Sequence, residues 1–327
     1  MRAVVAERHG GPEVLAEARR PDPEPGPADL LVRLTAAGVN FKDVYEREGR
    51  GAPRAPFVPG SEGAGTVVAA GPQAAAAGFR PGDRVAWCTA PASYAELVAV
   101  PAVSAVRVPD GIDDTDAAAI MLQGITAHYL TTSTYQAAGG ETALVHSAAG
   151  GLGRHLVRLL AHRGVRVIGT VSSAGKTAAA EAAGASDVIV REEGGDLAGR
   201  VRELTGGRGV DVVYDGIGRD TFDAGLASLR KRGTYVLVGT ASGTVPPFDP
   251  QSLAPRGSLF LTRPTLADHV GPDGELAGRA ADVFRWLDEG VLSTVIGGRY
   301  AFGKAAQAHA DLQSGTTTGK LLLDPAN

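Results

Sequence analysis

The sequence predicts an α/β protein with two parts, a β-rich domain and a doubly wound parallel sheet. From about residue 141 to 262, short apolar runs alternate with helical patterns, which is the spacing of a parallel sheet with crossover helices. Residues 1 to about 120 instead carry short apolar runs between turn signals such as Pro25-Gly26 and Pro81-Gly82. That pattern is typical of a small barrel or folded sheet. The chain has 327 residues, 44% of them hydrophobic, which is enough for two cores.

The individual elements follow from periodicity and turn chemistry. In the first part the sequence predicts strands over 30–34, 65–70 and 94–98, and then a helix over 114–130 with Asp113 or Asp114 as its N-cap. In the second part it predicts strands over 142–146, 165–171, 187–190, 210–214 and 234–239. A helix over 275–290 and a strand over 320–323 end the chain. We expect this short C-terminal piece to join the N-terminal domain, because it is too small to stand alone.

A glycine turn follows the strand at 142–146. Gly150, Gly151 and Gly153 come directly after Ala143-Leu144-Val145, and leucines at helical spacing lead from there to Arg163. Glycines let a backbone turn tightly and approach a pyrophosphate, and a helix N-terminus offers free N–H groups. The spacing, Ser147-x-x-Gly150-x-x-Gly153, is a shifted variant of the usual dinucleotide fingerprint. Its strand–turn–helix–strand context predicts a dinucleotide site.

The end of the next strand favours one dinucleotide over the other. Sites that prefer NADH carry an acidic residue there, which holds the ribose 2′-hydroxyl. This chain instead has Thr170, Val171, Ser172 and Ser173, with Lys176 close behind. Hydroxyls and an ammonium suit a 2′-phosphate that a carboxylate would repel. We therefore predict NADPH as the cofactor; the alternative for Lys176 is an ordinary solvated lysine.

Composition excludes several other classes of function. The net charge is −4 with both signs interspersed, so nucleic-acid or membrane-surface binding gains no support. No apolar stretch approaches transmembrane length, and the N-terminus lacks the shape of a signal peptide. The single cysteine, Cys88, can form no internal disulfide and is expected to be a buried thiol. These features predict a cytoplasmic protein.

Several motifs together resemble the medium-chain dehydrogenase/reductase superfamily, in its zinc-free quinone oxidoreductase branch. They are Gly38-Val39-Asn40-Phe41-Lys42-Asp43-Val44-Tyr45, Pro59-Gly60-Ser61-Glu62-Gly63-Ala64-Gly65, Gly82-Asp83-Arg84-Val85, Gln123-Gly124-Ile125-Thr126-Ala127-His128-Tyr129-Leu130 and Ser258-Leu259-Phe260-Leu261-Thr262-Arg263-Pro264. The resemblance implies a GroES-like catalytic domain over 1–122 and 265–327 and a Rossmann domain over 123–264. It also implies a homodimer or homotetramer joined through the cofactor-domain sheet.

The same resemblance argues against a metal. Zinc-dependent members carry a histidine where this chain has Ser61 and a cysteine near Asn40, and their structural zinc needs four cysteines. The seven histidines form no ligand cluster in the sequence. Without a Lewis acid to polarise an alcohol or ketone, alcohol dehydrogenase activity is not expected.

The resemblance then suggests which residues serve the cofactor and the reaction. Tyr45 and Asn40 are the candidate catalytic residues, Tyr45 either as a hydrogen-bond donor to the acceptor oxygen or as an aromatic wall with no chemical role. The expected cofactor contacts are Asn40, Thr126, Ala149, Gly150, Gly151, Leu152, Gly153, Ser172, Lys176, Arg191, Gly216, Val238, Gly239, Thr240 and Lys320. For Arg191 and Lys320 a surface position is an equal alternative.

The expected reaction is the metal-free reduction of a quinone by NADPH. A closely related alternative is an NADPH-dependent reductase of enones, 2-alkenals or enoyl thioesters, because one site could serve either acceptor. A third alternative is a non-catalytic NADPH-binding protein. The physiological acceptor, a small quinone or enone, cannot be read from the sequence.

Overall fold

The structure is a computed structural model that describes residues 1–51, 53–191, 195–271 and 275–326. The chain divides into two compact units. Unit 1 comprises Met1–Ile125, Val270–Gly290 and Thr294–Asn327, and unit 2 comprises Thr126–His269 and Val291–Ser293. The domain boundaries expected from the sequence, 122/123 and 264/265, lie a few residues before the boundaries between the two units, 125/126 and 269/270. Helix α3 (Asp114–Tyr129) carries the first boundary within its length.

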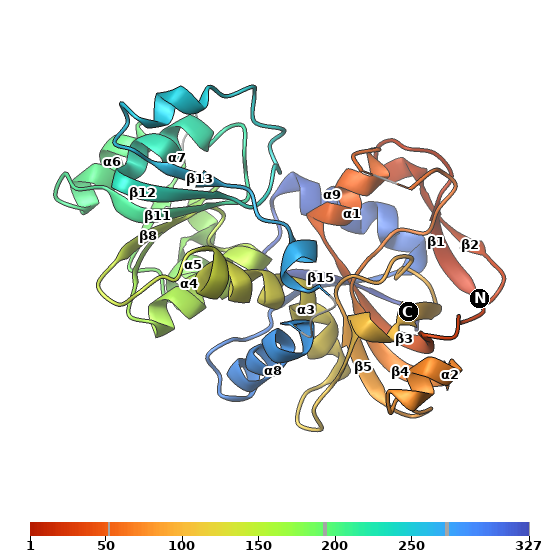
Figure 1. Cartoon of the computed structure of the whole chain (residues 1–327). Helices are drawn as coiled ribbons and strands as arrows, with labels where there is room; N and C mark the ends of the chain where they lie inside the picture. The colour runs from red at the N-terminus through yellow and green to blue at the C-terminus, as the bar shows by residue number, and fades with distance from the viewer. Residues whose placement is uncertain (52, 192–194, 272–274, 327) are drawn as a thin grey trace. The chain divides into compact units, whose positions relative to one another are not determined.

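Unit 1 is built around a seven-stranded, mainly antiparallel sheet (Figure 1). Its strands follow the order β14-β15-β3-β4-β5-β7, and β6 pairs with β3 outside this path. The strands are β3 (Asp29–Val39), β4 (Gly63–Ala70), β5 (Arg84–Trp87), β6 (Leu97–Pro101), β7 (Ala105–Arg107), β14 (Ile296–Ala301) and β15 (Lys320–Asp324). A separate pair is formed by β1 (Arg2–Ala6) and β2 (Leu15–Arg19).

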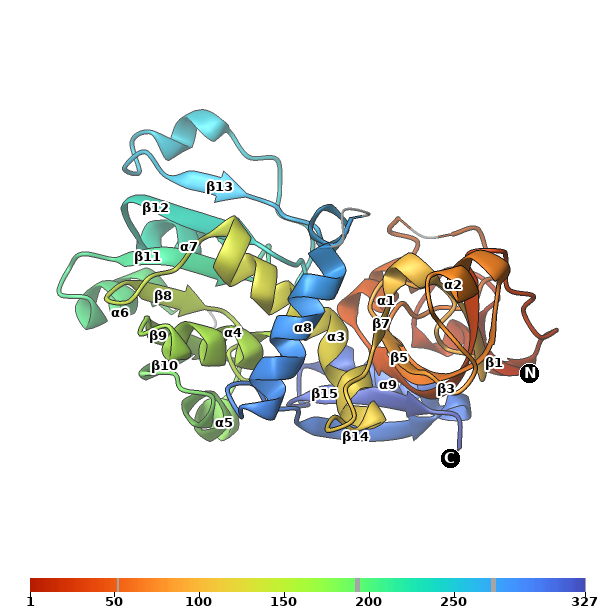
Figure 2. The ribbon, with the colours of Figure 1, turned by 60° about the horizontal axis from the view of Figure 1, so that its bottom comes forward.

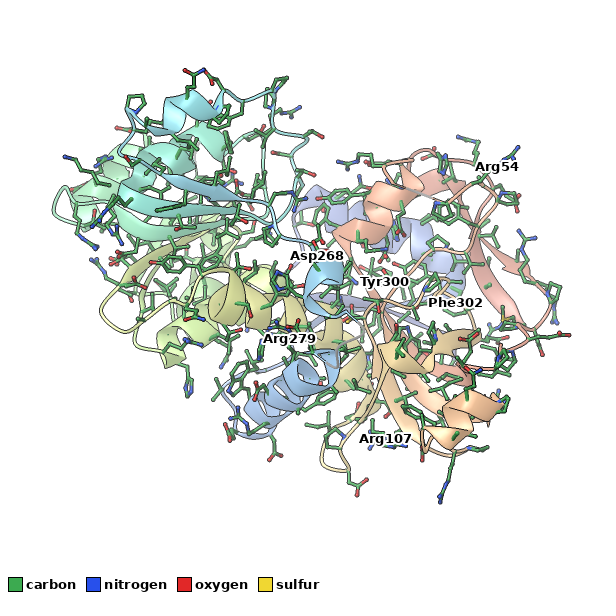
Figure 3. All side chains as sticks on the ribbon, viewed as in Figure 1. Arg54, Arg107, Asp268, Arg279, Tyr300 and Phe302 are labelled. Atoms are coloured by element: carbon green, nitrogen blue, oxygen red, sulfur yellow. The ribbon has the colours of Figure 1, made fainter. Side chains whose placement is uncertain are left out.

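The helices of unit 1 are α1 (Phe41–Arg47), α2 (Pro72–Ala76), α8 (Glu275–Asp288), α9 (Ala305–Ser314) and the first part of α3. The C-terminal piece completes the sheet, because β15 pairs antiparallel with β3 and places Leu321 opposite Val39. Phe302, labelled in Figure 3, follows β14 and is 2% exposed. It belongs to the same core as Val4 and Trp87.

Unit 2 is a six-stranded parallel sheet in the order β10-β9-β8-β11-β12-β13 (Figure 2). The strands are β8 (Thr142–Val145), β9 (Arg166–Val171), β10 (Asp187–Val190), β11 (Val210–Asp215), β12 (Leu229–Leu237) and β13 (Phe260–Thr262). The sequence of strand positions reverses between β8 and β11, as in a doubly wound dinucleotide-binding fold. The predicted fold class is confirmed.

Helices connect the strands of unit 2 in the expected places. They are α4 (Gly151–His162), α5 (Thr177–Ala182), α6 (Leu197–Leu204) and α7 (Phe222–Ser228). The pair α6 and α7 packs over one face, where Val201 and Leu226 join a core with Leu144, Ile168 and Val213. The helix of 12 residues after the glycine turn ends as its sequence indicates, since Gly164 lies just beyond it with a φ of +75°.

Some predicted boundaries were wrong. The helix expected over 114–130 ends at Tyr129 and continues as one π-helical turn over Leu130–Thr134. The strand expected over 94–98 begins only at Leu97, because the backbone N–H and C=O of Tyr94 pair with Pro59 and Val4 instead. The strand expected over 234–239 runs over Leu229–Leu237. Val238 and Gly239 therefore lie beyond its carboxyl end, because both of their N–H groups turn to the carbonyl of Asp215.

Candidate functional site

The glycine turn of unit 2 is shaped by the carbonyl of Ser147. Ser147 has a φ of +55°, a left-handed conformation that a serine adopts only where the surroundings impose it. Its carbonyl accepts the N–H of Gly150 at 2.8 Å. A Cβ on Gly153 would lie 2.1 Å from that same oxygen. The spacing Ser147-x-x-Gly150-x-x-Gly153 is therefore a packing requirement of this turn.

Helix α4 begins directly at this turn, with Gly150 as its N-cap in an extended conformation. The first N–H groups of a helix, here those of Gly151, Leu152 and Gly153, have no carbonyl partner within the helix. Together with the helix dipole they form a site for an anion. Ala149 is buried on the approach to the turn.

Ser172 and Lys176 lie where the sequence places them, past the carboxyl end of β9. Ser172 follows the last residue of the strand, and Lys176 ends the short 3₁₀ turn Ala174–Lys176. Partial burial lowers the pKa of Lys176. An anion beside this ammonium would restore the interaction that it loses on leaving water.

Arg191 directly follows β10 in the chain and extends its pairing, because its N–H binds the carbonyl of Val171 at 2.9 Å. The guanidinium group is half-buried, and burial lowers its pKa, while the carboxylates of Asp215 and Asp220 act in the opposite direction. Its Nε is buried and has no hydrogen-bond partner among the residues that the structure describes. Arg191 is thus a half-buried cation just past the carboxyl end of β10, which the alternative of a solvated surface position did not anticipate.

Two loops meet at the carboxyl ends of β11 and β12. The buried carboxylate of Asp215 accepts the N–H of Ile217 at 2.7 Å, the hydroxyl of Thr221 at 2.8 Å and the hydroxyl of Tyr235. A Cβ on Gly239 would lie 2.7 Å from the carbonyl of Gly216, whereas one on Gly216 would meet nothing within 4 Å. Gly216 therefore borders open space.

Val238 and Thr240 lie on the same pair of loops, flanking Gly239. The guanidinium of Arg263 donates to the carbonyl of Val238 at 2.6 Å. Arg263 therefore braces the loop that follows β12.

A buried histidine stands at the start of the glycine turn. His146 is 3% exposed, and its Nδ1 lies 3.0 Å from the hydroxyl of Thr170. Burial lowers the pKa of His146, so the ring is neutral at working pH. Its Nε2 has no partner within the described part of the chain. The carboxyl edge of this sheet thus presents open backbone groups and two unpaired side-chain nitrogens, those of His146 and Arg191.

Thr126 also belongs to unit 2, on α3, and is buried. Unit 1 holds the other residues singled out above, Asn40, Tyr45 and Lys320. Lys320 is 3% exposed, so the alternative of a surface lysine is wrong. Its ammonium binds Glu62 at 2.5 Å and Asn40 at 2.7 Å. The fold thus brings together three polar residues from β15, from the loop before β4 and from the N-terminal end of α1.

Tyr45 lies on α1 among an aromatic ring and a cation. The guanidinium carbon of Arg50 sits 4.0 Å from the centroid of its ring, and the ring of Phe41 is tilted against it at 6.1 Å. The side chain is neither buried nor fully exposed. These contacts hold the phenol ring from two sides.

A second polar network of buried side chains binds Asp43 and Arg47 of α1 to the rest of unit 1. The carboxylate of Asp43 accepts the N–H of Asn40 and the hydroxyl of Tyr94, each at 2.9 Å, and the hydroxyl of Ser61 at 3.2 Å. The hydroxyl of Tyr94 lies 3.2 Å from Nε2 of His309, whose Nδ1 lies 3.3 Å from the guanidinium of Arg47.

The hydrogen bonds of this network are donated in one direction, from Arg47 through His309 and Tyr94 to Asp43. Arginine can only donate, so Nδ1 of His309 accepts and Nε2 carries the proton. Nε2 then donates to Tyr94, and Tyr94 donates to Asp43. Burial lowers the pKa of His309 to about 3, and burial raises the pKa of Asp43 to about 6. His309 is therefore neutral at physiological pH, as this direction requires.

Sequence reasoning overlooked Asp43, Glu62, Tyr94 and His309. Asp43 and Glu62 lie within two of the family motifs, but neither residue was assigned a role. The signal that could have found them is their charge, because a charged residue inside an apolar motif is buried only when it is paired. No local pattern connects them to His309 or Lys320, which lie more than 200 residues away.

Among the residues that the structure describes, which leave out 52, 192–194, 272–274 and 327, no group of three or more His, Cys, Asp or Glu side chains could hold a metal ion. The resemblance implies that zinc-dependent members carry a ligand at Ser61 and another near Asn40; in this chain both side chains are engaged with neighbouring carboxylates.

The chain matches two family models. Residues 26–110 match the alcohol dehydrogenase GroES-like domain, and residues 151–271 match the domain described as zinc-binding dehydrogenase. Together the two matches cover a large part of both units.

Individual relatives span the whole chain. It is 42% identical to a quinone oxidoreductase of Pseudomonas aeruginosa, over 97% of each chain. It is 37% identical to a 2-haloacrylate reductase of a Burkholderia species, over 99% of this chain and 98% of the relative. A mycobacterial protein solved in complex with NADPH superimposes with a TM-score of 0.96 at 46% identity, covering 99% of this chain and all of that one.

Proposed function

This chain belongs to the medium-chain dehydrogenase/reductase family, in its quinone oxidoreductase branch, and on that premise we propose that it reduces quinones with NADPH. The observation that carries the proposal is the edge of unit 2. There, a turn whose Gly153 leaves no room for a Cβ leads into α4, and the end of β9 offers Ser172 and Lys176 where an NADH site would offer a carboxylate.

The residues present fit a bound dinucleotide phosphate. The first N–H groups of α4 suit the pyrophosphate, and the open space beside Gly216 admits a ligand close to the backbone. Ser172 and Lys176 suit the 2′-phosphate. Arg191 and His146 bring unpaired nitrogens to the same edge. We infer that Ala149, Val238, Gly239, Thr240 and Thr126 complete the contacts of the cofactor.

When bound, NADPH supplies a hydride to the acceptor. The protein has to orient the acceptor and to stabilise the charge that develops on its oxygen. Tyr45 is the candidate donor to that oxygen, because a phenol hydroxyl can donate a hydrogen bond and its ring is held by Arg50 and Phe41. Asn40 is the candidate contact to the nicotinamide end of the cofactor.

The test is turnover with a defined set of acceptors. We expect oxidation of NADPH by 1,4-benzoquinone and 9,10-phenanthrenequinone, followed optically, and a lower Kd for NADPH than for NADH. A Kd for NADH equal to or lower than that for NADPH would contradict the cofactor assignment. The variant Tyr45→Phe is expected to lower kcat, whereas unchanged kcat and KM would remove Tyr45 from the chemistry and leave it as a wall of the site.

A second candidate function is the reduction of an activated double bond. Its support is the 37% identity to the 2-haloacrylate reductase, which extends over nearly the whole chain. Short enones, a 2-haloacrylate and enoyl thioesters belong in the same panel. A kcat/KM for one of them above those for both quinones would favour this function, and NADPH binding without any turnover would favour a non-catalytic role.

We also propose that the protein is a homodimer joined through β13. This strand lies at the edge of the parallel sheet and exposes 61% of Phe260 and 36% of Leu261. An unpaired apolar edge is suited to pairing with the same strand of a second copy. Light scattering should give the mass of a dimer or tetramer for the wild type and a smaller assembly for Phe260→Asp. A monomeric wild type would contradict the proposal.

The single cysteine, Cys88, is not placed to react as a thiolate. Cys88 is fully buried, and this burial raises the pKa of its thiol.

Across the described residues no helix is long and apolar enough to cross a bilayer. We propose a cytoplasmic location, which a fluorescent fusion or cell fractionation would test.

A further inference from the structure

The amide of Asn40 is held in one orientation by three partners. Its Nδ2 donates to Glu62 Oε2 at 2.8 Å and to the carbonyl of Gly38 at 3.3 Å, and its Oδ1 accepts from the ammonium of Lys320 at 2.7 Å. An ammonium only donates and a carboxylate only accepts. A flipped amide would therefore set its NH2 against Lys320 and its oxygen against Glu62. Both partners exclude the flip.

Glu62 is the centre of this arrangement. Its Oε2 also binds Lys320 at 2.5 Å, and its Oε1 accepts the backbone N–H of Leu122 on α3 at 2.6 Å. Glu62 is fully buried and Lys320 is 3% exposed. A Cβ on Gly38 would lie 2.1 Å from Glu62 Oε2, so glycine at that position admits the carboxylate. The chain has therefore made room for this ion pair.

The stability of the fold does not explain the pair. Two buried charges gain little over a well-packed apolar pair of the same volume, because both must leave water. What they supply here is direction: both N–H groups of the Asn40 amide are taken by acceptors, and Oδ1 faces the ammonium of Lys320 and, in a capping box, the backbone N–H of Asp43. Asn40 can therefore donate no hydrogen bond to a ligand and can offer it only the amide oxygen, as an acceptor.

We propose that Glu62 and Lys320 are positioning residues that hold Asn40 as a pure acceptor for the nicotinamide end of the cofactor. The group it recognises is an N–H or O–H donor, which a carboxamide NH2 or a ribose hydroxyl provides. This inference rests on the proposed function, since it takes Asn40 as a contact of that half of NADPH. The pair acts through Asn40 and needs no contact with the ligand.

The test uses a charge-neutral double variant, Glu62→Gln with Lys320→Met. Each single change leaves an unpaired charge or a lone amide in a buried site, so both are expected to lower Tm. The double variant removes both charges together, so its Tm should recover most of the loss. Its Asn40 no longer faces a cation and a carboxylate, so we expect the Kd for NADPH to stay raised about tenfold, in spite of the recovered Tm.

Two ligands separate the nicotinamide end from the rest of the site. The double variant should weaken NADPH but leave the Kd of 2′,5′-ADP, which lacks the nicotinamide half, within about twofold of the wild type. An equal effect on both ligands, or recovery of NADPH binding together with Tm, would overturn the inference. Failure of the wild type to bind 2′,5′-ADP or NADPH would instead contradict the proposed function.

A mutant cycle with Asn40 tests whether the pair works through that amide. In the background of Asn40→Ala, the double change should cause no further loss of NADPH affinity, and an added tenfold loss would overturn the inference. Lys320→Arg keeps the cation and should retain most of the affinity. The matched control is Ser93→Ala, which removes the buried hydrogen bond from Trp87 at 2.8 Å. It should lower Tm while leaving both Kd values unchanged.

Discussion

The two units prepare their functional residues in opposite ways. In unit 1 the candidate side chains are held by other side chains. Asn40 is held by Glu62 and Lys320. Helix α1 is held by the hydrogen-bond network that links its Arg47 and Asp43 through His309 and Tyr94. In unit 2 the candidate site is mainly backbone, with a strained serine, glycines and the start of a helix. The side chains around it leave nitrogens unpaired, as His146 and Arg191 show among the described residues.

This difference has a physical reason. Backbone N–H groups at a helix start suit any phosphate, so a ligand that carries phosphates needs few directed side chains there. An uncharged ring amide or a reacting oxygen is recognised by single directed hydrogen bonds, and those require groups that are fixed beforehand. In unit 1 Asn40, Glu62 and Lys320 therefore bind one another, whereas at the edge of unit 2 one nitrogen each of His146 and Arg191 has no partner among the described residues.

The largest expected effect concerns the backbone of unit 2. Gly153→Ala would place a Cβ 2.1 Å from the carbonyl oxygen of Ser147, a rigid backbone atom. The turn must deform, so we expect at least about a 100-fold loss of NADPH affinity, or about 3 kcal/mol. Calorimetric titration measures it. Gly278→Ala, where a Cβ meets nothing within 4 Å, is the control, and equal losses in both variants would contradict a role specific to the turn.

The second prediction compares two arginines. Arg47 is buried and donates to Gly10 at 3.0 Å and to Gln313 at 3.0 Å besides contacting His309, so Arg47→Met should cost about 3 kcal/mol or more of unfolding free energy. Arg191→Met removes a guanidinium without a hydrogen-bonded partner among the described residues, so it should cost less than about 1 kcal/mol. Urea unfolding measures both. Similar losses would break the contrast between the units.

A third prediction concerns pH. Because the folded-state pKa of Asp43 is raised to about 6 from 3.8, the folded protein binds this proton more tightly than the unfolded chain. The resulting stabilisation is present below about pH 4 and is lost as pH rises to about 6. The loss amounts to about 3 kcal/mol. Asp43→Asn keeps an acceptor for Tyr94 without the charge, so its stability should lack this fall.

His309 acts in the opposite sense and serves as the control for Asp43. Its folded-state pKa is lowered to about 3, so its contribution is present above about pH 6.5 and is lost as pH falls toward 3. His309→Gln should therefore unfold less readily in acid than the wild type. Urea midpoints between pH 4 and pH 7.5 measure both variants. Curves parallel to the wild type would show that neither group titrates as described.

The smallest expected effect is on cofactor preference. Lys176→Ala removes one partly screened ammonium from the end of β9, so NADPH affinity should fall about tenfold, or about 1.4 kcal/mol. NADH lacks the 2′-phosphate, and its affinity should hardly change. Kd values for both cofactors measure the difference. Equal losses for NADPH and NADH would place Lys176 away from the 2′-phosphate.

Most of unit 2 could be predicted from the sequence, because its signals are local. A strand, a glycine turn and a helix follow one another within 21 residues of chain, from Thr142 to His162. The missing carboxylate after β9 is likewise visible as a residue type. The length of β12 was misjudged, since its first residues, Leu229 to Gly233, carry three charged side chains and a glycine in place of an apolar run.

The sequence by itself therefore determined the fold class, the family and NADPH as the expected cofactor, because backbone conformation and residue type at one place decide them. Only the tertiary structure decided which polar groups of unit 1 are paired. Lys320 meets Asn40 across 280 residues of chain, and Arg47 meets His309 across 262. Such contacts depend on the packing of β15 and α9 beside α1, and no local pattern encodes them.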